Sequence, residues 1–328
     1  MKISVAMATY NGELFVREQL ESIFAQTRPV DEVVICDDCS IDHTVEIIHE
    51  FIGAHNLAHW SLHINDKNVG YIKNFYSAIA RTTGDIIFLS DQDDIWHLDK
   101  IHIMKELFLT HPKLMALNTS FRKVDSSGNP FAQRLSATYN NHGLLPFRME
   151  ADECVRIPFE KVLWKNISPG CTMAFRASLK PFLMQHASFY APHDWEINLF
   201  SALEEGLYFY NRELIDYRIH ASNTLGMSTG QRCSLRMNTD QSTRERRAAE
   251  DAQKAEQYIL SKWIDSLSSE RKRDLTKYRT TTLARNQLLF EKRISKWCAT
   301  VLTMFSDYRK MQGVRGILGD LIYIIKTR

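Results

Sequence analysis

The chain has 328 residues, 44% of them hydrophobic, so it is long enough to bury a large core. Its 41 Lys and Arg residues nearly balance 39 Asp and Glu residues, and the net charge of +2 provides no overall field suited to nucleic acid. Six scattered cysteines, and an N-terminus without a basic segment followed by an apolar run, favour a reducing, cytoplasmic setting. We therefore expect a globular protein that binds no nucleic acid.

Short apolar runs predict strands at residues 3–8, 32–35, 60–64, 85–89 and 114–119. The segments between these runs carry apolar residues at helical spacing, such as Leu20, Ile23 and Phe24. This alternation predicts an α/β fold with a mainly parallel sheet flanked by helices. Ligands of such sheets bind beyond the carboxyl ends of the strands, so the loops there are the candidate site.

The rest of the chain predicts three further regions. Residues 121–170 have weak periodicity and predict irregular structure, whereas the polar segment 226–240 predicts a flexible loop or hinge. We expect one domain at 1–225 and a helical C-terminal module at 241–328. No run reaches the roughly 20 apolar residues of a membrane-spanning helix. The last 13 residues combine apolar and basic side chains, which fits either a helix docked on its own protein or contact with a membrane surface.

Three carboxylates, Asp91, Asp93 and Asp94, follow the apolar run at 86–90. Two carboxylate charges about 4 Å apart repel by about 4 kcal/mol at an effective dielectric constant near 20, so a positive partner is expected. Mg²⁺ or Mn²⁺ prefers such oxygen ligands and can also bind phosphate oxygens. For Asp94, the alternative is a cap on a helix that begins near Trp96.

A second acidic pair, Asp37 and Asp38, follows the predicted strand at 32–35. Carboxylates in this position typically accept hydrogen bonds from a ribose or a base, although helix capping by Ser40 or Asp42 is an alternative for the same loop. The lone Cys36 and Cys39 pair does not predict zinc or redox chemistry. The chain contains neither GxGxxG nor GxxxxGK[ST], which argues against dinucleotide oxidoreduction and P-loop chemistry.

Four segments, at residues 5–12, 34–44, 68–70 and 88–96, resemble in order and spacing the family-2 inverting glycosyltransferases of the GT-A fold. The resemblance covers residues 1–225. Segments 90–96 and 170–175 are similar in sequence to bacterial rhamnosyltransferases that build surface polysaccharides. The chain departs from the family at Cys39, where a glycine is usual, so the geometry of that loop is open.

The resemblance implies that Asp38 contacts the base, that Tyr10 lines the nucleotide site and that a divalent cation binds the diphosphate. It further implies that His220 completes the metal ligands and that Arg218 lies beside the phosphates. On this basis we expect the donor-binding residues to be Thr9, Tyr10, Asn11, Asp38, Asn68, Gly70, Lys73, Asp91 and Arg218, and the metal ligands to be Asp91, Asp93 and His220.

The resemblance also implies a catalytic base at Asp194, which follows His193 where many relatives carry Glu-Asp. A positioned base accelerates an inverting transfer by roughly 10²–10⁴-fold, because it takes the proton of the acceptor hydroxyl. An N-cap for a helix at 196–203 is the alternative. We expect Gly170, Cys171 and Trp195 on the acceptor side.

The sequence therefore predicts an inverting, metal-dependent glycosyltransferase that moves a sugar from a nucleotide sugar to a glycan or lipid-linked oligosaccharide in O-antigen or capsule synthesis. We favour dTDP-rhamnose as the donor, with a UDP-hexose as the alternative. A non-catalytic nucleotide-sugar-binding relative is a second alternative. A sugar-1-phosphate nucleotidyltransferase would need a Gly-rich, basic first loop, which residues 8–13 lack. We expect a cytoplasmic protein, with peripheral contact at the inner face of the plasma membrane left open.

Overall fold

The computed structural model describes residues 1–131, 141–145, 147–163, 166–187, 189, 191–220, 268–291 and 293–326. Contacts between residues divide the chain into two compact units. The sheet unit comprises residues 1–162 and 166–233, and the helical unit comprises residues 163–165 and 234–328. The hinge predicted at 226–240 lies outside the described residues, and the predicted division of the chain into domains remains a prediction.

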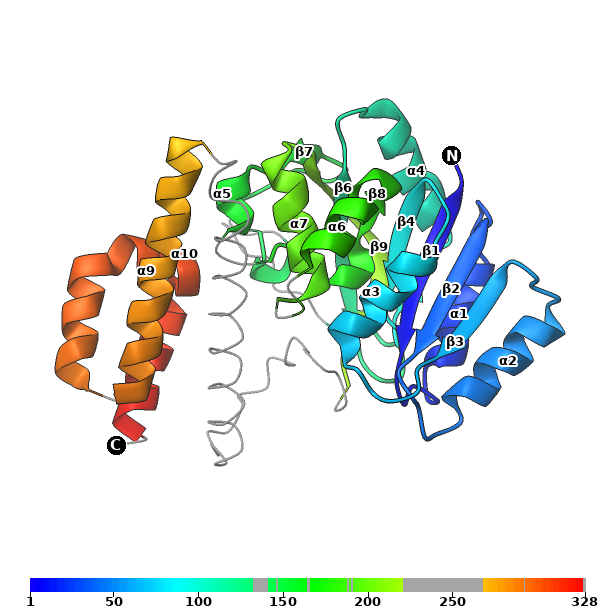
Figure 1. Ribbon diagram of the computed structural model, residues 1–328, viewed down its shortest axis with the longest axis horizontal. Coiled ribbons are helices and arrows are strands. Elements are labelled where there is room, and N and C mark those ends of the chain that lie inside the picture. Colours follow the sequence, from blue (N-terminus) through cyan, green and yellow to red (C-terminus); the bar gives the residue numbers. More distant parts are fainter. Residues whose placement is uncertain are drawn as a thin grey trace. The chain divides into compact units, whose positions relative to one another are not determined.

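Nine strands of the described residues form one sheet in the order β3-β2-β1-β4-β8-β6-β9-β5, with β7 beside β9 (Figure 1). Strands β1 to β4 pair in parallel, and β8 runs antiparallel between β4 and β6. The predicted mainly parallel α/β sheet is thus confirmed. The strands are β1 (Ile3–Thr9), β2 (Glu32–Asp37), β3 (Trp60–Ile64), β4 (Ile86–Ser90), β5 (Ile95–Trp96), β6 (Ala116–Val124), β7 (Cys154–Arg156), β8 (Ala174–Arg176) and β9 (Leu207–Arg218).

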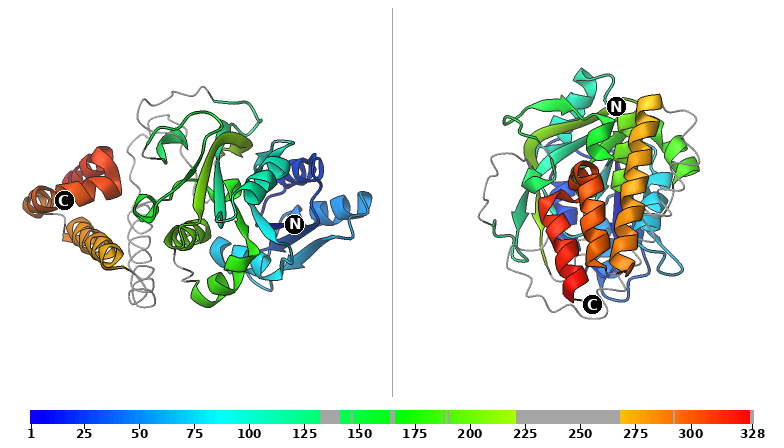
Figure 2. Two further views of the ribbon diagram at one scale, coloured as in Figure 1. Left: turned by 90° about the horizontal axis from the view of Figure 1, so that it is seen from above. Right: turned by 90° about the vertical axis from the view of Figure 1, so that its left-hand side faces the viewer.

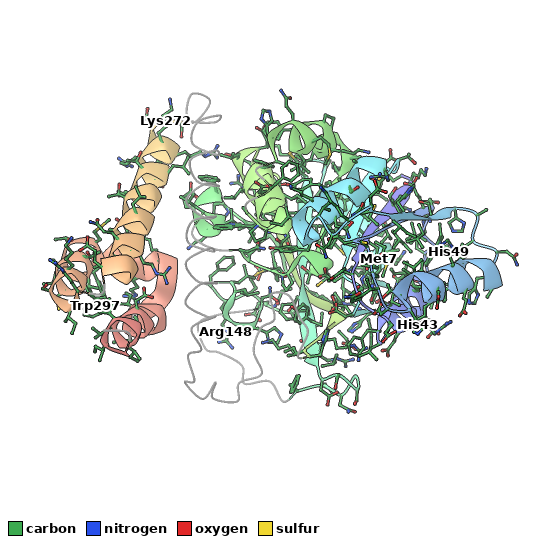
Figure 3. The ribbon with its side chains drawn as sticks, turned by 60° about the horizontal axis from the view of Figure 1, so that its bottom comes forward. Met7, His43, His49, Arg148, Lys272 and Trp297 are labelled. Carbon is green, nitrogen blue, oxygen red and sulfur yellow. The ribbon has the colours of Figure 1, made fainter. Side chains whose placement is uncertain are left out.

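Helices cover both faces of this sheet because alternate side chains of its central strands point to opposite sides. Ile3, Val5 and Met7 of β1 share one hydrophobic cluster with α1, α2 and α4, and Met7 is labelled in Figure 3. Helices α3, α6 and α7 pack together, and α3 contacts β1 and β2. The helices of the sheet unit are α1 (Val16–Phe24), α2 (Thr44–Ala54), α3 (Tyr71–Arg81), α4 (Lys100–Thr110), α5 (Phe159–Val162), α6 (Lys180–His186) and α7 (His193–Leu203), with 3₁₀ turns η1 (Asn141–Gly143), η2 (Gly170–Thr172) and η3 (Ala177–Leu179).

Two local predictions are wrong. The helix expected near Trp96 is instead strand β5, which pairs with β9, and the next helix begins at Lys100. The capping alternative for Asp94 therefore fails, because no helix follows it directly. The region 121–170, expected to be irregular, contains β7, α5 and the last residues of β6. These short elements escape sequence patterns because three or four residues are too few to show a period.

The helical unit contains α9 (Ser269–Glu291) and α10 (Ile294–Lys326) among its described residues. The Tyr308 hydroxyl donates to Asp320 Oδ2 at 2.5 Å, although a straight helix would separate residues 12 positions apart by about 18 Å. Helix α10 therefore turns back on itself, and its two arms lie side by side in Figures 1 and 2. Arg285 of α9 donates twice to the same carboxylate, at 2.8 and 2.9 Å, which ties α9 to α10.

The C-terminal arm of α10 has one buried and one exposed apolar face. Ile317 and Ile324 are buried against the helical unit, whereas Leu318, Ile322 and Ile325 are exposed. The tail is therefore docked on its own protein through one face only. None of the described helices combines the length and apolar composition needed to cross a membrane.

Candidate functional site

Because β1 to β4 are parallel, the loops that follow them meet at one edge of the sheet. We call the loops after β1, β2 and β3 the donor side, and η2 with the first turn of α7 the acceptor side. Backbone and side-chain hydrogen bonds join the first two loops. Asn11 N donates to Ser40 Oγ at 2.8 Å, Ile41 N donates to Asn11 Oδ1 at 3.0 Å, and Thr9 Oγ1 donates to Asp37 Oδ2 at 2.7 Å. Two predicted donor-binding residues, Thr9 and Asn11, thus hold these loops together.

The second loop keeps its turn without the usual glycine. Cys39 has φ of 65°, and Asn11 in the facing loop has φ of 47°. Both lie in the left-handed region, which asparagine tolerates better than cysteine does. Asp42 accepts from Thr44 N at 3.0 Å, so it serves the first turn of α2, whereas Ser40 binds Asp37. The N-cap of α2 is His43, so neither Ser40 nor Asp42 is the cap, although Asp42 accepts from the N–H of the first residue of the helix.

Asp38 anchors the third loop. Its carboxylate accepts from Asn65 Nδ2 at 2.9 Å, Val69 N at 2.8 Å and Gly70 N at 2.8 Å, and it is almost fully buried. Gly70 has φ of +88° and precedes α3, a conformation that glycine adopts at no steric cost. The predicted contact of Asp38 with a base remains a prediction.

Two other predicted donor-binding residues flank Gly70. Asn68 Oδ1 accepts from Gly70 N at 3.1 Å, and Lys73 is exposed on the first turn of α3. They lie on the same sheet edge as Asp38.

Gln92, inside the acidic motif, fastens that motif to the first loop. Tyr10 N donates to Gln92 Oε1 at 2.7 Å, and Gln92 Nε2 donates to Tyr10 O at 3.0 Å. A Cβ atom on Gly12 would lie 2.3 Å from Gln92 Oε1, so a larger residue there would displace the Gln92 amide from Tyr10. The Tyr10 side chain itself stays 44% exposed, free to meet a ligand.

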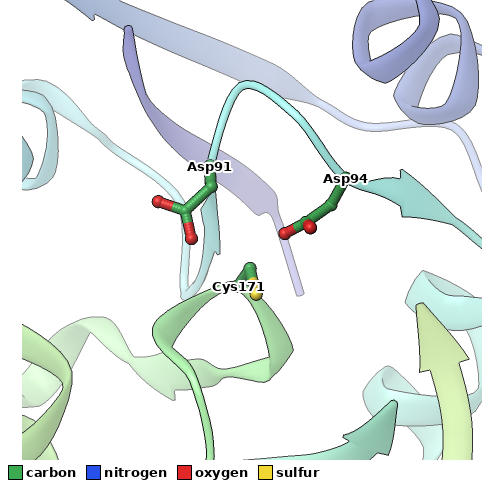
Figure 4. A group of neighbouring side chains, drawn as sticks. All are labelled: Asp91, Asp94 and Cys171. Carbon is green, nitrogen blue, oxygen red and sulfur yellow. The ribbon is translucent and has the colours of Figure 1, made fainter. Parts of the chain in front are cut away.

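The acidic motif gathers a compact cluster, shown in Figure 4, in which ligand atoms of Asp91, Asp94 and Cys171 lie within 4.8 Å of one another. Burial, and then the neighbouring Asp94 carboxylate, raise the pKa of Asp91 well above its usual range. Burial and the Asp93 carboxylate raise the pKa of Asp94 to about 7. Burial likewise raises the pKa of the Cys171 thiol, which keeps it protonated and makes it a poor metal ligand.

Lys100 supplies a cation beneath this cluster. It is fully buried, its ammonium donates to Cys171 O at 2.6 Å, and it lies 4.0 Å from the centre of the Trp96 ring. Burial lowers the pKa of Lys100 to about 7, and the carboxylates of Asp94 and Asp91 oppose that decrease. No sequence pattern indicated this residue, because a lysine at the start of a helix ordinarily lies in solvent.

The three predicted metal ligands fall into two neighbouring groups. His220 Nε2 lies 2.7 Å from Asp93 Oδ2, whereas Asp91 belongs to the cluster with Asp94 and Cys171. Carboxylate oxygens with one imidazole suit Mn²⁺ or Mg²⁺, and the raised pKa of Asp91 shows crowded carboxylates that a cation would relieve. The carboxylates therefore suit the expected divalent cation, although the described residues do not gather Asp91, Asp93 and His220 at one point.

Arg218 holds the acidic motif in place through several hydrogen bonds. Its Nε donates to Asp93 O at 2.8 Å, its guanidinium donates to Ser126 O at 2.9 Å and pairs with Glu18, and its backbone N donates to Asp94 Oδ1 at 3.1 Å. The side chain is 1% exposed. Its predicted place beside the phosphates remains a prediction.

Asp194 lies in the first turn of α7, which begins at His193 with Pro192 as its N-cap. The N-cap alternative for Asp194 is therefore wrong by two positions. Trp195 N donates to Asp194 Oδ1 at 2.9 Å, and Asn166 Nδ2 donates to Oδ2 at 2.7 Å. Burial nevertheless raises the pKa of Asp194 to about 6, a range that suits a general base near neutral pH.

Gly170 of η2 packs tightly against the first turn of α7. A Cβ atom there would lie 3.1 Å from both Asp194 Cβ and His193 Nε2. His193 stacks on Phe75 with ring centres 3.9 Å apart, and burial lowers its pKa to about 3. Among the residues that the structure describes, neither ring nitrogen of His193 has a hydrogen-bond partner. Trp195, also expected here, donates from its indole to Val162 O at 2.7 Å.

Tyr71, which the sequence did not single out, lies near both Asp194 and Asp91. Burial, and then the carboxylates of Asp194 and Asp91, raise the pKa of Tyr71 to about 12. The phenol therefore keeps its proton and can donate a hydrogen bond between the acidic cluster and Asp194.

A family model described as glycosyl transferase family 2 matches residues 4–180, more than half of the chain. The chain belongs to this family. The match includes the loops after β1 to β4 and η2, and it confirms the resemblance found in the sequence. A glycosyltransferase activity follows from the family.

Two relatives with named activities are similar in sequence. The dTDP-rhamnosyl transferase RfbG of Shigella flexneri is 29% identical over 231 residues, which is 67% of this chain and 73% of RfbG. The poly(ribitol-phosphate) beta-N-acetylglucosaminyltransferase TarS of Staphylococcus aureus is 35% identical over 96 residues, 29% of this chain and 16% of TarS.

Solved structures confirm the fold. S. aureus TarS 1-349 in complex with UDP-GlcNAc has a TM-score of 0.61 at 15% identity, covering 100% of this chain and 90% of that one. The mannosyltransferase PcManGT from Pyrobaculum calidifontis, in complex with GDP-Man and Mn²⁺, has a TM-score of 0.56 at 17% identity, covering 99% and 85%. The expected GT-A architecture is therefore present.

Proposed function

We propose that this glycosyltransferase is inverting and metal-dependent, and that it transfers rhamnose from dTDP-rhamnose to a glycan or lipid-linked oligosaccharide in bacterial surface polysaccharide synthesis. The observation that carries the mechanism is the placement of Asp194. It lies buried close enough to Tyr71 and to Asp91 of the acidic motif that the charge of its carboxylate affects both groups. The similarity to RfbG over two thirds of the chain favours the donor.

Asp194 takes the proton of the acceptor hydroxyl in this mechanism. The freed oxygen attacks the anomeric carbon as the bond from that carbon to the diphosphate breaks on the opposite face, so the configuration inverts. The raised pKa of Asp194 makes its carboxylate a stronger proton acceptor than an exposed aspartate. Inversion is tested by comparing the anomeric configuration of donor and product by NMR, and retention would contradict this role.

Asp91, Asp93 and His220 would hold the divalent cation. When bound, the cation would neutralise the diphosphate leaving group, which is the usual chemistry of Mg²⁺ or Mn²⁺ at such a site. Arg218 keeps the acidic motif in place through Asp93 O and Asp94 Oδ1. The buried Lys100 amine donates to Cys171 O, and the carboxylates of Asp94 and Asp91 favour its charged form.

Thermal unfolding with nucleotides tests the donor. A bound ligand raises stability by RT ln(1 + [L]/Kd), so the true donor should raise the Tm most, and more so with Mn²⁺. We expect dTDP and dTDP-rhamnose to exceed UDP, UDP-hexoses and GDP. A larger shift with UDP-hexoses would support the alternative donor, and no shift with any nucleotide would contradict donor binding. Donor bound without turnover would indicate a non-catalytic relative.

The exposed face of α10 supports peripheral contact with the inner face of the plasma membrane, where a lipid-linked acceptor would lie. Leu318, Ile322 and Ile325 are exposed along one face, and Arg309 with Lys310 is exposed on the preceding arm.

Deleting the tail is a poor test of this contact, because the deletion also removes the buried Asp320. We expect the double substitution Leu318→Gln and Ile322→Gln to reduce sedimentation with anionic vesicles. Leu14→Gln serves as the control, since Leu14 is 80% exposed on the sheet unit. Unchanged sedimentation of the double variant would exclude this contact.

A further inference from the structure

Three asparagine side chains form a hydrogen-bonded line that ends at Asp194. Asn118 Nδ2 donates to Asn198 Oδ1 at 2.7 Å, and Asn198 Nδ2 donates to Asn166 Oδ1 at 2.8 Å. Asn166 Nδ2 then donates to Asp194 Oδ2 at 2.7 Å. We call Asn118, Asn198 and Asn166 the asparagine chain. It joins strand β6, helix α7 and the loop before η2 to one carboxylate.

The direction of this chain is fixed by chemistry. An ionised carboxylate only accepts hydrogen bonds, so Asn166 must present its NH₂ group to Asp194. Its Oδ1 then accepts from Asn198 and also from Ile167 N at 2.9 Å. Reversing any one amide would bring two acceptors or two donors face to face. All three amide dipoles therefore point their positive ends toward the carboxylate.

Burial strengthens the effect of the chain. Asn118 and Asn198 are both fully buried, so water cannot replace either partner. In such a low-dielectric setting, consecutive hydrogen bonds polarise one another, and the last bond, to an ionised group, is the strongest. This bond favours the ionised form of Asp194, while burial favours the protonated form.

Both oxygens of the base are held. Oδ2 accepts from Asn166, and Oδ1 accepts from Trp195 N at 2.9 Å. Because each oxygen accepts a hydrogen bond, the plane of the Asp194 carboxylate group is fixed. A rigid base of this kind presents its remaining lone pairs in a fixed direction, which is what positioning requires.

We propose that the asparagine chain positions Asp194 and keeps it ionised for proton transfer, so that Asn118 and Asn198 are positioning residues that act through Asn166. The inference rests on the proposed function, since it treats Asp194 as the base. It adds a fixed hydrogen-bond line from the sheet to that base, which neither the sequence motifs nor the family membership supplies.

Other titratable groups around Asp194 are accounted for. Tyr71 of α3 and Asp91 of the acidic motif face it, as their mutual charge effects show. On α7 itself, burial lowers the pKa of His193 to about 3, so the ring is neutral, and Glu196 accepts from Tyr76 Oη at 2.6 Å. None of these groups belongs to the asparagine chain, so a change in the chain can be measured against a constant background.

The test measures the ionisation of Asp194 directly, without any substrate. Protein with ¹³C-labelled aspartate carboxyl groups is titrated by NMR, and the Asp194→Asn variant identifies the resonance. We expect Asn166→Ala to raise the pKa of Asp194 by about one unit, which is a ten-fold change in the ionisation constant. Asn118→Ala, two links away, should raise it by a smaller amount.

Asn74→Ala is the matched control. Asn74 is equally buried, but its Nδ2 donates to Cys36 O at 2.8 Å on the donor side, so the Asp194 titration should stay unchanged. The proposal is overturned if Asn118→Ala and Asn166→Ala lower the Tm yet leave the pKa of Asp194 as in the wild type. If Asn118→Ala fails to fold, Asn166→Ala decides, because Asn166 is only half-buried.

Turnover separates this inference from the proposed function. A shifted Asp194 titration in Asn166→Ala, together with wild-type turnover of dTDP-rhamnose in Asp194→Asn, would leave the chain in place and refute the base. An unshifted titration with turnover lost in Asp194→Asn would keep the base and refute the chain.

Discussion

The donor and acceptor sides occupy the same edge of one sheet, yet they differ in how far their polar groups are already satisfied. On the donor side, Asp38 accepts three hydrogen bonds and the loops after β1 and β2 are joined through Asn11. On the acceptor side, the described residues offer no partner to either nitrogen of His193. The polar groups of the donor loops therefore bind one another, whereas the acceptor side retains buried hydrogen-bonding capacity among the described residues.

Among the substitutions considered, removing the carboxylate of Asp194 on the acceptor side should lower turnover most. Asp194→Asn should lower kcat by about 10²–10⁴-fold, because the amide cannot take the hydroxyl proton. Donor affinity should remain near the wild-type value, since Asp194 lies outside the donor loops. Steady-state turnover and nucleotide binding measure the two quantities. An equal loss in both would contradict the separation of the two sides.

In the acidic motif after β4, Asp93→Asn should weaken Mn²⁺-dependent donor binding by at least about ten-fold while altering donor binding without metal much less. The reason is that Asp93 pairs with His220 and supplies a carboxylate to the expected ligands. Calorimetric titration of the donor, with and without Mn²⁺, measures its affinity for the protein. Lys73→Met, on the exposed first turn of α3, gives a comparison that leaves all predicted metal ligands in place. Metal-independent loss in Asp93→Asn would remove it from the ligand set.

The pH dependence of turnover tests the role of Asp194 on the acceptor side. Burial raises the pKa of Asp194 from its ordinary value of 3.8 to about 6, so the base is active only above that range. With saturating donor and Mn²⁺, kcat should therefore fall about ten-fold for each pH unit below about 6. Stability follows the opposite sign, because ionising a carboxyl with a raised pKa destabilises the folded protein as the pH rises from about 4 to 6. A flat kcat profile between pH 5 and 7 would contradict this assignment.

A small change in stability is expected from Cys39, in the loop after β2. Cys39 has φ of 65°, which costs an L-residue about 1–2 kcal/mol. Cys39→Gly should raise the free energy of unfolding by up to about 1 kcal/mol, because the greater flexibility of glycine in the unfolded chain offsets part of the gain. Urea unfolding measures it, and Cys39→Ala, which keeps the cost, is the control. A loss of stability in Cys39→Gly would show that the cysteine side chain contributes more than the strained backbone costs.

The sheet and the positions of the polar loops were predictable because buried parallel strands read as apolar runs with polar residues at their ends. The environments of single residues were not. Strand β5 is two residues long, and its pairing with β9 depends on a partner about 120 positions away. Lys100 and Asn118 are buried only because distant segments fold over them, and no local pattern records that. Arg218 was expected near phosphate, but its surroundings became visible only in three dimensions.

The imidazole of His193, which has no hydrogen-bond partner among the described residues, also affects the stability of the fold. Each buried polar group without a hydrogen bond costs a folded protein about 1–3 kcal/mol, and this ring has two such nitrogens beside the base. A phenylalanine would keep the stacking on Phe75 without that cost. A selection for heat resistance alone would therefore favour replacement of His193. The buried ring is neutral, so one of its nitrogens can donate a hydrogen bond while the other accepts one.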